Sequence, residues 1–103
     1  MDYLADLKKY TTGPDEDVVA AMEKTYRLVL SQPDSAVVSY SDSEELERIK
    51  KNFLVRKLGL TDTDDLDGGL EAVGAKMKGV HRKNRLTVYY LLAEHFGKLD
   101  VLR

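Results

Sequence analysis

The stretch of sequence that decides the fold covers residues 85–97 and reads RLTVYYLLAEHFG. Its apolar side chains lie around most of the circumference of a helix, where a surface helix would carry a single apolar stripe. Asn84 stands where a residue caps the start of a helix, and Gly97 where a glycine ends one. We therefore expect this helix at the centre of the molecule, wrapped by the rest of the chain. The alternative is that one of its edges is left for a second copy or for another protein.

Four further segments carry apolar residues at helical spacing, which predicts an all-α fold, a compact bundle of about five helices in a single domain over residues 1–103. The four expected helices cover residues 2–10, 15–30, 41–58 and 66–78. The third has the clearest start, because the Ser41 hydroxyl can accept from a free backbone amide while Glu44 reaches back to the cap. Residues 35–40 are too few to reveal a period and are predicted to be irregular.

The fourth expected helix has an unfavourable interior. It contains Gly68, Gly69 and Gly74, each of which costs about 1 kcal/mol relative to alanine within a helix. The start of this helix is therefore the least well defined of the five.

Composition narrows the class of protein. The 103 residues are 43% hydrophobic and include no cysteine, so disulfide frameworks, thiolate nucleophiles and sulfur-based zinc sites are excluded. The longest stretch without a charge is residues 86–93, eight residues against the roughly 18 that cross a bilayer. The acidic start, Met1-Asp2-Tyr3-Leu4-Ala5-Asp6, differs from the basic start of an export signal, so we expect a cytoplasmic protein.

Charge is distributed unevenly along the chain. Residues 1–75 hold 9 basic and 16 acidic residues, whereas residues 76–103 hold 7 basic and 2 acidic. The first four expected helices place carboxylates near their starts and cations near their ends, as the helix dipole favours. The last helix reverses this order, because Arg82, Lys83 and Arg85 crowd its start. A negative partner is therefore expected there.

Two kinds of partner fit the basic start of the last helix. One is an acidic helix start folded against it, either residues 64–67 or residues 15–17. The other is a bound anion held by free amides and basic side chains. The candidate anion-binding residues are Arg82, Lys83, Asn84, Arg85 and Thr87. A net charge of −2 and the lack of exposed aromatics within the basic stretch argue against nucleic acid.

No motif of catalysis or metal binding fits the sequence. Residues 62–71 resemble a calcium loop, but Leu66, Asp67 and Val73 occupy positions that require a ligand, a glycine and a glutamate. The two histidines, His81 and His95, lack a second ligand at helical spacing. We therefore expect no metal and no cofactor, and an enzyme is less favoured than a non-enzymatic protein-interaction module. Its partner would be itself or another protein; the alternative function is anion or nucleic-acid binding at the last helix.

The remaining basic cluster lies on the third expected helix. It consists of Lys50, Lys51, Arg56 and Lys57. These side chains follow the dipole rule, so we expect them to be solvated surface residues without a ligand.

Several stretches of the chain resemble a known family. They are residues 53–62 (FLVRKLGLTD), 76–79 (KMKG), 82–83 (RK) and 89–99 (YYLLAEHFGKL). These residues are similar to a family of short bacterial proteins described as a domain of unknown function, and the likeness covers nearly the whole chain. The resemblance implies a small, stand-alone, all-helical cytoplasmic protein, and it supplies no catalytic residues.

Overall fold

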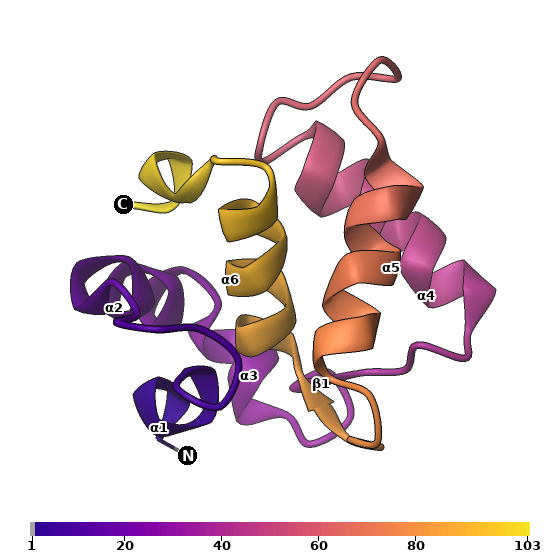
Figure 1. Ribbon diagram of the computed structural model, residues 1–103. Helices are drawn as coiled ribbons and strands as arrows, with labels where there is room; N and C mark the ends of the chain where they lie inside the picture. The colour runs from indigo at the N-terminus through magenta and orange to yellow at the C-terminus, as the bar shows by residue number, and fades with distance from the viewer. Residues whose placement is uncertain (1) are drawn as a thin grey trace.

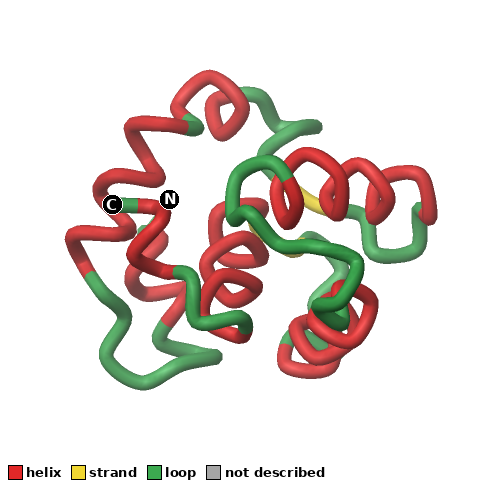
Figure 2. The backbone as a smooth tube through the Cα atoms, turned by 90° about the horizontal axis from the view of Figure 1, so that it is seen from above, coloured by secondary structure: helices red, strands yellow, loops and turns green. Residues whose placement is uncertain are grey.

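The computed structural model describes residues 2–103, and helices make up most of this part of the chain (Figure 1). Its elements in chain order are α1 (Tyr3–Leu7), α2 (Glu16–Thr25), α3 (Arg27–Ser31), β1 (Val37–Val38), α4 (Ser43–Ile49), the π-helix η1 (Lys50–Val55), α5 (Leu66–Lys76), β2 (Lys83–Asn84), α6 (Arg85–His95) and the 3₁₀-helix η2 (Leu99–Leu102). Figure 2 shows how short the strands are beside the helices.

The last helix, α6, is the centre of the fold. Its buried residues are Leu86, Thr87, Val88, Tyr90, Leu91, Leu92 and Ala93. It contacts α1, α2, α5, η1 and η2, and in Figure 1 it stands between α2 on one side and α5 on the other. Segments from both halves of the chain thus pack against this helix, whereas α4 is not among its main neighbours.

The fold is mostly helical but not strictly all-α. Val37 and Val38 pair antiparallel with Asn84 and Lys83, so the prediction that residues 35–40 are irregular is wrong at these two positions. Val38 is buried at 1% exposure, which gives the extended segment an apolar anchor. This short strand pair joins two segments that lie far apart in the sequence, so the local spacing of apolar residues cannot predict it.

Two of the expected helices are shorter than the apolar pattern suggested. The first ends at Leu7, and the second breaks at Tyr26, whose φ of −103° and ψ of 17° leave the helical region. The break turns the Tyr26 ring against Tyr89 of α6, with 5.4 Å between ring centroids. The helical spacing of apolar residues continues across the break at Tyr26, so the sequence pattern did not predict the break.

The third expected helix begins one residue later than predicted and then changes its winding. The cap of α4 is Asp42, not Ser41, and its carboxylate accepts from the backbone N–H groups of Glu44 and Glu45 at 3.0 and 3.4 Å. After Ile49 the chain continues as the π-helix η1, a rare and wide turn. Within it Phe53 and Leu54 are both buried, and Phe53 stacks on Tyr89 at 4.0 Å between centroids.

The glycines of α5 are explained by their neighbours. A Cβ at Gly69 would overlap the Phe96 ring, and one at Gly74 would lie 3.0 Å from the Tyr40 ring. Asp65 caps the helix by accepting from the Gly68 N–H at 3.0 Å. Glycine is therefore tolerated within α5 because the rings of Phe96 and Tyr40 pack so close to the helix that a Cβ would not fit.

Among the described residues, no helix has the length and apolar character needed to cross a membrane. The same residues contain no group of three histidine, cysteine or acidic side chains positioned to hold a metal ion.

Candidate interaction site between α4 and α5

The basic start of α6 is occupied by internal partners. Arg85 Nε donates to the Ser35 carbonyl at 2.5 Å, and Nη1 donates to the Tyr89 hydroxyl at 3.1 Å. Nη2 donates to the Val37 carbonyl at 3.2 Å and to Glu45 Oε1 at 2.5 Å. The Arg85 side chain is only 12% exposed. The partner carboxylate is thus Glu45, in the first turn of α4, and not either of the acidic helix starts expected from the sequence.

This ion pair shifts both members toward their charged forms. Burial opposes ionisation of Glu45, but hydrogen bonds from Arg85 and Arg48 outweigh it and hold the pKa of Glu45 below its ordinary value. Burial likewise opposes the charge on Arg85, and the hydrogen bond to Glu45 keeps the pKa of Arg85 above its ordinary value. The pair is a structural connection between α4 and α6.

A second internal carboxylate lies at the start of α6. Asp6 is buried at 8% exposure, and its Oδ2 accepts from Thr87 Oγ1 at 2.6 Å and from Asn84 Nδ2 at 3.1 Å. Asn84 holds the N-cap position of α6 as expected, but its side chain reaches to α1. Asp6 places negative charge near the helix start, where the dipole favours it.

The remaining two candidates do not converge with these residues on one cavity. Lys83 Nζ donates to the Val80 carbonyl at 2.6 Å and lies 5.3 Å from the centroid of the Tyr40 ring, whereas Arg82 is exposed in the preceding turn. The hollow beside Arg85 is lined by three carboxylates, those of Asp34, Asp42 and Glu45. These carboxylates repel an anion, so external anion binding at these positions stays a prediction without support from the local geometry.

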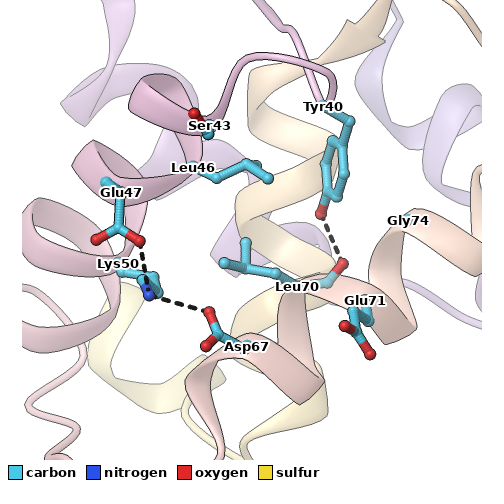
Figure 3. A pocket seen from close by; sticks show the side chains of 9 residues that line it. All are labelled: Tyr40, Ser43, Leu46, Glu47, Lys50, Asp67, Leu70, Glu71 and Gly74. Atoms are coloured by element: carbon cyan, nitrogen blue, oxygen red, sulfur yellow. Dashed lines mark hydrogen bonds and ion pairs between the residues drawn. The ribbon is translucent and has the colours of Figure 1, made fainter.

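A larger pocket, of about 580 Å³, opens between α4 and α5 (Figure 3). Its lining residues are Tyr40, Ser43, Leu46, Glu47, Lys50, Asp67, Leu70, Glu71 and Gly74. Leu46, Leu70 and the Tyr40 ring supply apolar surface; the carboxylates of Glu47 and Asp67 contact the Lys50 ammonium group, and the Glu71 carboxylate lies apart from it. The pocket therefore suits an apolar group that carries positive charge.

Lys50 closes one end of this pocket. Its ammonium group lies 2.9 Å from Glu47 Oε1 and 3.0 Å from Asp67 Oδ1, and so connects η1 to α5. The Lys50 side chain is 22% exposed, while the two carboxylates are 71% and 74% exposed. The expectation that Lys50 is a solvated surface residue is wrong, because the approach of α5 brings Asp67 to it and its side chain is partly buried; Lys51, Arg56 and Lys57 are exposed as expected.

Tyr40 closes the other end. Its hydroxyl donates to the Leu70 carbonyl at 3.1 Å, and burial raises the pKa of Tyr40 to about 12. Its ring faces Gly74, where the absence of a Cβ makes room for it. At this pKa the Tyr40 hydroxyl stays protonated near neutral pH.

The acidic surface extends beyond the pocket. A neighbouring hollow of about 340 Å³ shares Lys50 and Asp67 with it and adds Asp62, Asp64 and Asp65. Sequence reasoning treated these residues as a capped helix start and missed the pocket beside them. One available signal was Asp67 and Glu71, two carboxylates at i and i+4 that repel each other on one helix face.

Comparison with known proteins places the chain in a family. Residues 2–100 match the family described as "Protein of unknown function (DUF2853)". The chain belongs to this family, which confirms the resemblance to a domain of unknown function. No curated protein matches the chain.

Proposed function

We propose that this protein is a non-enzymatic protein-interaction module that binds its partner at the pocket between α4 and α5. The observation that carries the proposal is the combination of an apolar floor and an acidic rim in one open pocket. The volume of about 580 Å³ lies within the range of about 300–1,000 Å³ that is typical of ligand pockets. An occupant with an apolar body and a cationic group would match both parts of the lining.

Two further features support a binding role. The π-helix η1 begins at Lys50, the residue that closes one end of the pocket, and π turns occur frequently at functional sites. The carboxylates of Glu47 and Asp67 remain largely exposed although each contacts Lys50. Because both carboxylates are already exposed, a second cation can contact them without any rearrangement that uncovers them.

The test is site-specific photo-cross-linking in the native cell. A photoreactive side chain replaces Ser43, which lines the pocket, and in a control protein it replaces Lys24 on α2. In Figure 1, α2 lies on the opposite side of α6 from α5. We expect a discrete adduct from position 43 and none of the same mass from position 24.

A blocking variant makes this test specific to the pocket. Glu71→Trp places a bulky side chain at the rim, and Glu23→Trp, at an exposed position of α2, is the matched control. The adduct should disappear in Glu71→Trp and persist in Glu23→Trp. Equal adducts from positions 43 and 24, or an adduct that survives Glu71→Trp, would contradict the proposal.

The alternative function, anion or nucleic-acid binding at the start of α6, has its own test. Thermal melts with phosphate and with chloride at matched ionic strength measure anion-specific stabilisation. Because Arg85, Asn84 and Thr87 have internal partners, we expect no difference between the two salts. A phosphate-specific rise in melting temperature that Arg82→Gln removes would favour the alternative.

A further inference from the structure

The exposed face of α5 has an ordered arrangement of charge. Asp67 and Glu71 lie on its first turns, Gly74 and Ala75 follow, and Lys78 comes one turn later, just past the helix end. At 100° per residue these positions share one side of the helix. Asp67, Glu71, Ala75 and Lys78 are all exposed. The face is therefore acidic at one end, small in the middle and basic at the other end.

The charges nearest the middle of this face have no ion-pair partner among the described residues. Gly74 and Ala75 occupy the positions three and four residues from Glu71, and the same two residues precede Lys78 by four and three. Glu71 and Lys78 are separated by about 10.5 Å of helix rise, which is too far for a direct pair. The preceding turn offers Glu71 only the like charge of Asp67. Glu71 and Lys78 therefore lack an opposite charge on their own helix face, and both side chains are exposed and open to contact by another molecule.

The sequence of this face is complementary to itself. If two copies of α5 run antiparallel about a two-fold axis between Gly74 and Ala75, Glu71 lies opposite Lys78 and Gly74 lies opposite Ala75. Each pair occurs twice, once for each copy.

We propose that the partner bound at this surface is a second copy of the chain, joined through antiparallel contact of the two α5 helices. The inference rests on the proposed function, because it names the occupant of the same surface: Asp67, Glu71 and Gly74 line the pocket as well. The small, exposed side chain of Ala75 allows approach at the middle of the face, while the Tyr40 ring of each chain covers Gly74 beside it. Charge complementarity is what selects a second copy as the occupant.

The contact is weak by its nature. One pair of helices buries less than the roughly 1,200 Å² that stable complexes bury, and exposed ion pairs contribute little each. We therefore expect a reversible dimer that forms at high protein concentration and weakens as salt is added.

Charge reversal tests the pairing. Glu71→Lys sets two cations opposite each other at both symmetric contacts, and Lys78→Glu sets two carboxylates opposite each other. Sedimentation equilibrium should show each variant dimerising about tenfold more weakly than the wild type. An equimolar mixture of the two variants restores opposite charges at both contacts and should dimerise as the wild type does. Glu23→Lys, on α2, is the control and should change nothing.

A cysteine at the axis tests the geometry. The chain has no cysteine, so Ala75→Cys introduces a single thiol next to the two-fold axis. A disulfide requires Cα atoms about 4.4–6.8 Å apart, a separation that antiparallel α5 helices reach at their crossing. Mild oxidation should give a covalent dimer of Ala75→Cys and little of the control Ala20→Cys, an exposed position of α2.

The outcomes separate this inference from the proposed function. A wild type that stays monomeric at millimolar concentration, together with equal cross-linking of the two cysteine variants, would overturn the second copy as partner. If the Ser43 adduct then has a mass other than that of two copies, the interaction function stands with a different partner. If that adduct is absent as well, both proposals fail.

Discussion

Arg85 and Lys50 are two cations that attach the α4–η1 segment to a neighbouring helix, yet their surroundings differ. Arg85 is 12% exposed, and its guanidinium donates to two carbonyls, a hydroxyl and Glu45. Lys50 contacts two carboxylates that are each more than two-thirds exposed, beside an open pocket. The residue that resembled a ligand site in the sequence is a buried structural connection, and the residue that resembled plain surface lines the candidate site. Burial and the number of partners, more than charge itself, separate the two roles.

The largest effect should come from Arg85→Met. This change leaves the Glu45 carboxylate and the carbonyls of Ser35 and Val37 without their main donor in a part-buried setting. We expect a loss of about 3 kcal/mol in the free energy of unfolding, measured by urea denaturation. A loss below about 1 kcal/mol would mean that Arg85 is no more structural than Lys50, and the comparison would break.

Thr87→Val tests whether the second internal carboxylate also fixes the start of α6. The substitution keeps the shape of the side chain but removes the 2.6 Å hydrogen bond to the buried Asp6. Hydrogen bonds to charged groups contribute about 2 kcal/mol, and a loss of that size is expected in the same denaturation experiment. Thr25→Val, at an exposed position of α2, is the control and should have little effect.

Acidification should weaken the Arg85 connection selectively. The folded pKa of Glu45 lies below its unfolded value of about 4.3, so the stabilisation is present above that value and is lost as pH falls through the folded pKa. The difference in unfolding free energy between the wild type and Glu45→Gln should therefore shrink as pH falls below about 4. A difference that stays constant through this range would show that the charge on Glu45 contributes nothing.

Lys50→Met should have the smallest effect. Its ion pairs reach carboxylates that are largely solvated, and such pairs contribute less than about 1 kcal/mol. The methionine retains the apolar stem against the pocket wall. A loss of unfolding free energy comparable to that of Arg85→Met would show that Lys50 is a structural residue. It would argue against a pocket rim whose charges are free to bind a partner.

The sequence was informative where the signal was local. The all-round apolar character of residues 85–97 predicted the central helix, and the reversed charge at its start predicted a negative partner. The identity of that partner was not predictable, because Glu45 precedes Arg85 by 40 residues, and the segments before the two helices are joined by the pairing of β1 with β2. Local periodicity carries no information about such a contact.

The candidate site was hidden for a related reason. Its lining comes from three separate segments, around Tyr40, along α4 and η1, and along α5. The glycine at position 74 looked like a weakness of the helix, whereas the structure shows it accommodating the Tyr40 ring. The π winding of residues 50–55 was equally hidden, because the apolar spacing across residues 46–54 fits an ordinary α-helix.

The position of α6 near the C-terminal end of this sequence has a consequence for biosynthesis. A chain emerges from the ribosome N-terminal end first, at about 5–20 residues per second. Helices α1 to α5 therefore leave the ribosome before the helix against which α1, α2 and α5 pack. The surfaces of α1, α2 and α5 that contact α6 stay uncovered until residues 85–95 have been translated, so we expect the complete core to form only after synthesis of this region.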